Sequence, residues 1–168
     1  MFTEKLRLNT KGHNMKKDIQ NYFKITIPAK SANEAFSRSL ISAFITQLDP
    51  TIEELCDIKT ALSEAVTNCI VHAYTDNDPE AKKTITISAL IYKNNSVLIK
   101  IKDRGCGIED IGKALLPMYS GSGSDERSGM GFSIMQCFTD SMKVTSKKDR
   151  GTTVTLKKYI GKRNEEGN

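Results

Sequence analysis

The chain has 168 residues, 38% of them hydrophobic, and a formal net charge of +5 at pH 7. This length suits one domain that folds around its own core without disulfides or metals. No apolar run approaches the roughly 20 residues that span a bilayer, and the N-terminus lacks the apolar segment of a secretory signal. We therefore expect a cytoplasmic protein without membrane contact.

The cysteines do not indicate a metal site or a disulfide framework. None of the four forms a Cys-x-x-Cys pair, and the two histidines are far apart in the sequence. Cys69 and Cys137 are expected as small core residues, whereas Cys106 lies between two glycines and is expected to be accessible.

The two ends of the chain differ from its middle. Residues 1–14 have no hydrophobic period and are expected to be a disordered, non-native leader, followed by a single domain over 15–160 and a frayed tail over 161–168. From Lys143 to Arg163 there are eight basic residues and one acid, Asp149. This bias suits nucleic acid or a lysine-guarded sheet edge, and we favour the edge because no aromatic residues interleave to stack bases.

The first half of the domain reads as a strand and two helices. Tyr22 to Pro28 alternates as a strand. Two possible capping boxes follow, Ser31 with Glu34 and Thr51 with Glu54, each before a helical pattern. Asp49-Pro50 separates the two helices.

The second helix, which reaches about Tyr74, carries polar residues at the edge of a broad apolar arc. Glu64, Asn68 and His72 follow at i, i+4 and i+8, so they share one ridge beside a half-buried crevice. A carboxylate there can accept a proton, and a carboxamide can hold Mg²⁺ through its oxygen. The pair alone is also typical of a solvated helix face, and for His72 a buried structural role is favoured over a catalytic one.

The second half of the domain alternates strands with glycine-rich segments. Its expected elements are strands over 83–91 and 96–102 joined by a hairpin, a short helix over 109–115, a lid-like segment over 120–128, a helix over 129–138 capped by Ser128, and strands over 142–146 and 152–159.

Two glycine motifs lie in this half. Asp103-x-Gly105-x-Gly107 follows a strand, where Asp103 can accept from an exocyclic amine and the glycines let the backbone approach a flat ligand. Gly129-x-Gly131 opens a helix and offers unpaired N–H groups to phosphate. Arg127 precedes it and can reach a terminal phosphate, although a solvated loop position is as good an interpretation.

The order of these motifs resembles one superfamily. Glu64-Ala-Val-Thr-Asn68, Asp103-Arg-Gly-Cys-Gly107, Gly129-Met-Gly-Phe132 and Gly151-Thr-Thr153 are similar to the conserved boxes of the GHKL, or Bergerat-fold, ATP-binding proteins. Within it, the segments ending at Pro50, Asn68 and Phe132 resemble the family of anti-sigma factors and serine kinases of sporulating bacteria. The resemblance implies a two-layer α/β sandwich, with a mixed, mostly antiparallel sheet and helices on one face.

The resemblance also implies the roles of individual residues. Glu64 would be the catalytic base and Asn68 the Mg²⁺ ligand in an ATP/ADP site. The other residues implied for nucleotide binding are Asp103, Gly105, Gly107, Ile108, Arg127, Gly129, Met130, Gly131, Phe132 and Thr153. The lid from Ser120 to Ser124 is looser than expected for this family.

The implied function is an ATP-dependent protein serine kinase that acts in a homodimer. It would inhibit a sporulation sigma factor and phosphorylate an anti-anti-sigma protein, with Arg38 on the first helix as a candidate partner contact. The alternatives are a histidine-kinase-type ATP-binding domain, a nucleotide-dependent binding module without catalysis, and a basic nucleic-acid-binding module. Direct nucleic-acid binding is not expected.

Overall fold

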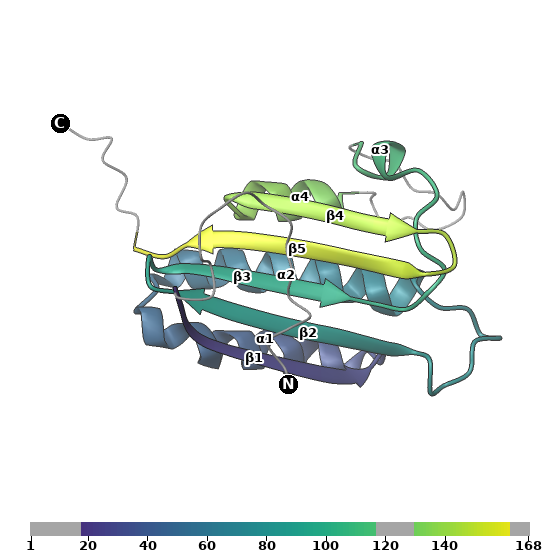
Figure 1. The fold of residues 1–168 in the computed structure, drawn as a ribbon, viewed down its shortest axis with the longest axis horizontal. Helices are drawn as coiled ribbons and strands as arrows, with labels where there is room; N and C mark the ends of the chain where they lie inside the picture. The colour runs from purple at the N-terminus through teal and green to yellow at the C-terminus, as the bar shows by residue number, and fades with distance from the viewer. Residues whose placement is uncertain (1–17, 117–129, 162–168) are drawn as a thin grey trace.

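The structure is a computed structural model that describes residues 18–116 and 130–161. Five strands form one sheet in the order β1-β2-β3-β5-β4 (Figure 1). The strands are β1 (Ile19–Pro28), β2 (Thr84–Tyr92), β3 (Ser96–Lys102), β4 (Ser141–Lys147) and β5 (Gly151–Tyr159). The helices are α1 (Ala32–Ile45), α2 (Ile52–His72), α3 (Ile111–Ala114) and α4 (Gly131–Phe138), with a short 3₁₀ helix, η2 (Thr46–Leu48).

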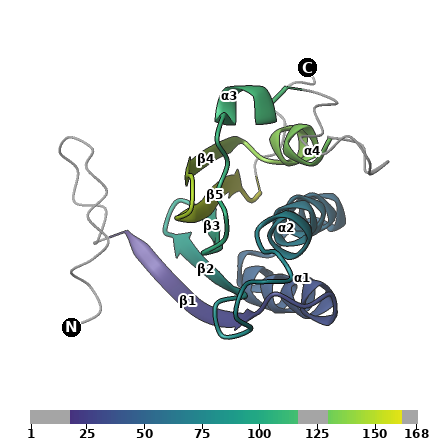
Figure 2. The same ribbon diagram turned by 90° about the vertical axis from the view of Figure 1, so that its right-hand side faces the viewer.

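The domain has two layers, a sheet and the helices that cover one of its faces. Figure 2 shows α1 and α2 on the same side of the sheet, with α4 beside α2. All four strand pairings are antiparallel, so the described part of the sheet contains no parallel pair. The α/β sandwich expected from the sequence is therefore confirmed, with a sheet that is antiparallel rather than mixed.

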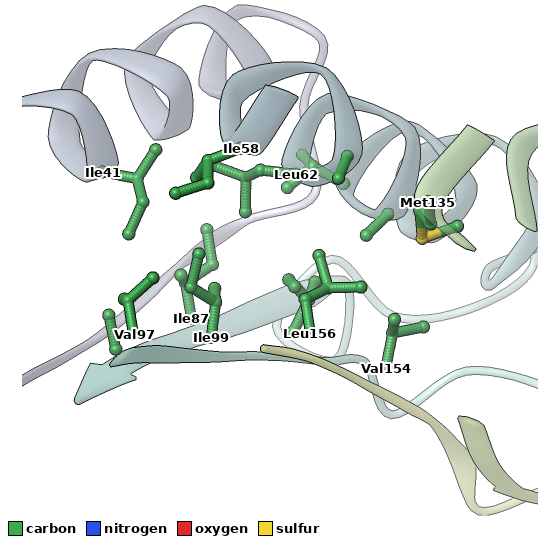
Figure 3. Close-up of a cluster of buried hydrophobic side chains, with 14 of the residues drawn as sticks. Ile41, Ile58, Leu62, Ile87, Val97, Ile99, Met135, Val154 and Leu156 are labelled. Carbon is green, nitrogen blue, oxygen red and sulfur yellow. The ribbon is translucent and has the colours of Figure 1, made fainter. Parts of the chain in front are cut away.

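The core lies between the sheet and α2 (Figure 3). Alternate residues of the central strands face the helices, and the register places Ile101 between Ile87 on β2 and Val154 on β5. All three of these side chains are almost completely buried. The period of two in the sequence thus places one residue of each pair in the core and the next on the open face.

The apolar arc of α2 fixes that helix on the sheet. Ile58, Leu62 and Val66 are at most 1% exposed. Burial of side chains of this size contributes about 1.5–3 kcal/mol each. The polar ridge of Glu64, Asn68 and His72 adjoins this apolar face of α2. Its position at the edge of the core is therefore fixed as well.

The two expected capping boxes have different outcomes. Thr51 caps α2 as expected, since the Glu54 amide donates to Thr51 Oγ1 at 3.1 Å and the Thr51 amide donates to Glu54 Oε2 at 2.9 Å. The Ser31 box is wrong. Ser31 already has helical backbone angles and makes no side-chain cap, and Glu34 accepts a hydrogen bond from the Ser63 hydroxyl instead.

Two residues that were expected to be buried are exposed in the structure. Cys137 points outward because the short helix α4 buries Met135 rather than Cys137. His72 is the last residue of α2 and is exposed, although the next residue, Ala73, is buried. Cys69 is buried and Cys106 is exposed, as expected.

Some expectations fall beyond the described residues. The leader over 1–14, the tail after Gly161, the lid-like segment over 120–128 and the Ser128 cap all lie there. None of the described helices has both the length and the hydrophobicity that a bilayer crossing requires.

The two capping positions make a matched test of stability. Replacing Thr51 by alanine (Thr51→Ala) removes a side-chain acceptor from the first turn of α2 and is expected to lower the free energy of unfolding by about 1 kcal/mol. Ser31→Ala removes a side chain that caps nothing and is expected to change it little. Urea denaturation of both variants measures the difference, and equal losses would contradict the assignment.

Candidate active site

Glu64 and Asn68 lie one turn apart on α2, both half-buried, at the edge of the core. Neither side chain makes a hydrogen bond or ion pair with any described residue. The first residue of α4, Gly131, lies over them. A Cβ on Gly131 would stand 3.1 Å from Glu64 Oε2 and 3.5 Å from Asn68 Oδ1. The start of α4 therefore packs closely over the polar ridge of α2.

Partial burial also alters the acidity of Glu64. Desolvation raises the pKa of its carboxyl above the ordinary value of 4.5, because burial disfavours the charged form. A carboxylate with a raised pKa accepts a proton more readily than a fully solvated one. Glu64 is thus suited to take a proton from a hydroxyl that enters the crevice.

Asp103 follows β3 and is 3% exposed. Its Oδ1 accepts hydrogen bonds from the backbone amides of Gly105 at 2.9 Å and Thr152 at 3.0 Å. Its Oδ2 accepts one bond, from the Cys69 thiol on α2, with an S···O distance of 3.7 Å. The carboxylate is therefore held by three segments of the chain and keeps acceptor capacity on Oδ2.

The glycines after Asp103 are required by contacts within the protein. A Cβ on Gly105 would lie 1.9 Å from the Ala73 carbonyl oxygen, and one on Gly107 would lie 2.2 Å from that of Lys147. Gly107 also has a φ of 73°. The sequence suggested that these glycines admit a flat ligand. In the structure, the lack of a Cβ lets the loop pack tightly between the end of α2 and the β4–β5 turn. This close packing positions Asp103.

Ile108 and Thr153 have different relations to this loop. Ile108 is half-buried and donates its amide to Ser146 Oγ at 2.7 Å. Thr153 alternates with the buried Val154, so its side chain lies on the open face of the sheet and the structure does not bring it to Asp103. The backbone amide of Thr152 donates to Asp103, while the Thr152 hydroxyl hydrogen-bonds with that of Ser146. Counting the period of two from Val154 would have favoured Thr152.

The start of α4 has backbone N–H groups that the helix itself leaves without partners. The first helical hydrogen bond runs from the Ile134 amide to the Met130 carbonyl at 2.8 Å, so the amides of Gly131 and Phe132 have no partner within the helix. Met130 is exposed and Phe132 packs partly against the core. The other residues expected at this end, Arg127 and Gly129, lie outside the described residues.

A hollow of about 400 Å³ borders Glu64 on the outer side of α1 and α2. It is lined by Arg38, Cys56, Lys59, Thr60, Ser63 and Glu64. Arg38 comes from α1, and its guanidinium lies 3.0 Å from Glu34 Oε1, which also accepts from the Ser63 hydroxyl. The sequence placed Arg38 on the polar side of α1 but did not show that it stands beside Glu64.

The comparison with family models defines the class of protein. Residues 27–158 match the histidine kinase-like ATPase domain, which covers most of the chain. Two solved structures share the fold. The RsbU and RsbW domains of Rv1364c from Mycobacterium tuberculosis align over 83% of this chain and 32% of that one, with a TM-score of 0.60 and 18% identity. The SiaB–SiaC complex from Pseudomonas aeruginosa aligns over 84% and 90%, with a TM-score of 0.60 and 11% identity.

Closer relatives define the family. The anti-sigma F factor of Caldanaerobacter subterraneus subsp. tengcongensis is 47% identical over 86% of this chain and 98% of its own length. That of Clostridium perfringens strain ATCC 13124 is 48% identical over 84% and 99%. The chain therefore belongs to the anti-sigma F factor family. It has an anti-sigma, kinase-type role, and its ATPase-type domain implies nucleotide binding.

The glycine contacts generate a stability prediction. Gly105→Ala places a methyl group against the Ala73 carbonyl and is expected to lower the free energy of unfolding by about 1–3 kcal/mol. A methyl group in Gly131→Ala meets only the ends of the Glu64 and Asn68 side chains, which can move, so the free energy of unfolding is expected to stay almost unchanged. Chemical denaturation of both variants tests the pair. A Gly105→Ala variant as stable as the wild type would show that the loop does not pack as closely against Ala73 as described.

Proposed function

We propose that this protein is an anti-sigma factor and serine-protein kinase. It binds and inhibits a sporulation sigma factor as a nucleotide-dependent homodimer, and it transfers the γ-phosphoryl group of Mg-ATP to a serine of an anti-anti-sigma protein. The observation that carries the enzymatic part is the pairing of Glu64 with Asn68 on one half-buried ridge, with no partner among the described residues. Membership of the anti-sigma F family supports the two protein partners.

The donor set fits a magnesium nucleotide. Asn68 offers a carboxamide oxygen, which suits a hard cation, and the described residues contain no group of three or more acidic, histidine or cysteine ligands. A cation held by Asn68 would thus need phosphate oxygens to complete its shell. The amides of Gly131 and Phe132 would bind phosphate, as would Met130, with Arg127 and Gly129 as further proposed contacts.

Base recognition is proposed for the loop after β3. Asp103 would accept from the exocyclic amine of adenine through Oδ2, whose only described partner is the Cys69 thiol. Gly105 and Gly107 would act indirectly by holding the loop, and Ile108 would form an apolar wall. The sequence resemblance suggested Thr153 as the threonine of this site, and we propose Thr152 instead, because its backbone amide donates to Asp103.

The phosphoryl transfer requires mainly that the reacting groups are held in position and that the phosphate charge is neutralised. Mg-ATP supplies an electrophilic γ-phosphoryl group with a neutralised leaving group. Glu64 would orient the substrate serine hydroxyl and accept its proton as the new O–P bond forms. The position of Glu64 on a packed helix keeps the base in place without a covalent intermediate.

Glu64→Gln separates catalysis from binding. The amide keeps the shape of the side chain but cannot accept the proton, so the rate of serine phosphorylation is expected to fall by about 10²–10⁴-fold while the affinity for Mg-ADP is retained. In the wild type the rate is expected to fall on acidification, because Glu64 must be ionised, with a midpoint above the ordinary 4.5 since its pKa is raised. Quantitative phosphoserine assays across pH measure both effects.

Each outcome of that experiment has a distinct meaning. A variant that phosphorylates at the wild-type rate would remove Glu64 from the chemical step. A wild type that binds nucleotide but phosphorylates no serine would favour a binding module. Phosphorylation of histidine in place of serine would favour a histidine-kinase-type domain.

Arg38 is the proposed partner contact, because it stands on α1 at the mouth of the hollow beside Glu64. Arg38→Glu reverses its charge and is expected to weaken sigma-factor binding by about tenfold or more, without changing the affinity for Mg-ADP. Lys93→Glu, in the β2–β3 turn, makes the same change in net charge and is the matched control. Calorimetric titration measures both. Equal losses in the two variants would indicate a general charge effect and contradict a specific role for Arg38.

A further inference from the structure

The carboxylate of Asp103 is bound asymmetrically. Two backbone amides hold Oδ1, which ties it to the loop at Gly105 and to β5 at Thr152. The Cys69 thiol alone contacts Oδ2 among the described residues, at an S···O distance of 3.7 Å. Asp103 is 3% exposed and Cys69 is 4% exposed, so little water competes for these bonds.

This geometry fixes the plane of the carboxylate. Because the carboxylate is planar, rotation about the Cβ–Cγ bond moves both oxygens together, and the two amides on Oδ1 already restrain it. The thiol adds a third restraint on the same torsion, from the side of Oδ2. It is a weak donor and uses one of the two acceptor positions on Oδ2, so the other position remains free for a stronger N–H donor.

The thiol also connects two parts of the site. Cys69 follows Asn68 on α2, and one residue on a helix corresponds to a turn of about 100°. Asn68 therefore lies on the half-buried ridge, whereas Cys69 faces the core and reaches Asp103. One turn of α2 therefore carries the proposed metal ligand, Asn68, and also contacts Asp103, the residue proposed to bind the base.

We propose that Cys69 is a positioning residue for purine recognition, whose thiol orients Asp103 so that Oδ2 meets the exocyclic amine of adenine. The inference rests on the proposed nucleotide-binding function and adds a residue that the motifs do not assign. Without the thiol, the carboxylate is restrained through Oδ1 alone, its torsion varies over a wider range, and the site loses part of its preference for a purine that carries the amine.

A residue that served only packing would behave differently. Replacing such a residue would lower the stability of the protein and would reduce its affinity for every nucleotide by the same factor. A positioning residue changes the ratio of affinities between a purine with the amine and one without it. The ratio is therefore the informative quantity, and it requires no catalytic turnover.

The test is calorimetric titration of the full chain with two ligands, Mg-ADP and the Mg complex of purine riboside 5′-diphosphate, which lacks the 6-amino group. The wild type is expected to prefer ADP. Cys69→Ala, which removes the donor, is expected to reduce that preference by about threefold to tenfold. Cys69→Ser, which keeps a donor of similar size, is expected to retain it. Asp103→Asn is the reference for a site that no longer accepts from the amine.

Thermal unfolding without nucleotide is the control for folding. If Cys69→Ala does not fold, Cys69→Val fills the space without a donor and serves the same comparison. An unchanged preference in the variant that lacks the donor, with only a lower melting temperature, would overturn the inference and leave Cys69 as a packing residue. A folded wild type that binds neither ligand would overturn the proposed function itself, and the inference with it.

Discussion

The packing of one long helix, α2, against an antiparallel sheet is the constraint on which the rest of the molecule depends. Its inner face places Ile58, Leu62 and Val66 in the core, and these contacts fix the rotation of the helix about its axis. Because rotation is fixed, Glu64 and Asn68 must lie at the boundary between core and solvent. The stability of the core and the position of the polar ridge are thus set by the same interaction.

The loop after β3 depends on this helix in turn. Gly105 packs against the carbonyl of Ala73, just beyond the end of α2, and Cys69 contacts Asp103 from within the helix. The β4–β5 turn closes the other side through Gly107 and Lys147. The pattern of this glycine-rich motif suggests contact with a ligand. Within the protein, its glycines allow the close packing that holds the buried carboxylate of Asp103 in a defined position.

Functional sites commonly retain groups that are unfavourable for stability, and Glu64 fits this pattern. Burial raises its pKa, which means that the ionised side chain destabilises the folded state at neutral pH. No described residue makes a hydrogen bond or an ion pair with its carboxylate. An unpartnered carboxylate beside an unpartnered amide is more readily explained by a ligand or substrate than by folding.

The sequence by itself determined the elements, the fold class and the side of α2 that carries the polar ridge. Those features follow from local periods, from capping chemistry such as that of Thr51 and Glu54, and from motif order. Only the tertiary structure decided which groups meet. The Ser31 box failed because Glu34 accepts a hydrogen bond from Ser63, 29 residues away. His72 and Cys137 are exposed although the residues after them, Ala73 and Phe138, are buried or pack against the core, so the way each helix packs decides which of its sides is covered. The Thr152 amide and the Cys69 thiol both reach Asp103 from distant segments, and Arg38 on α1 lines the same hollow as Glu64 on α2. Sequence periodicity describes one element at a time, whereas such contacts are fixed by how the elements pack together.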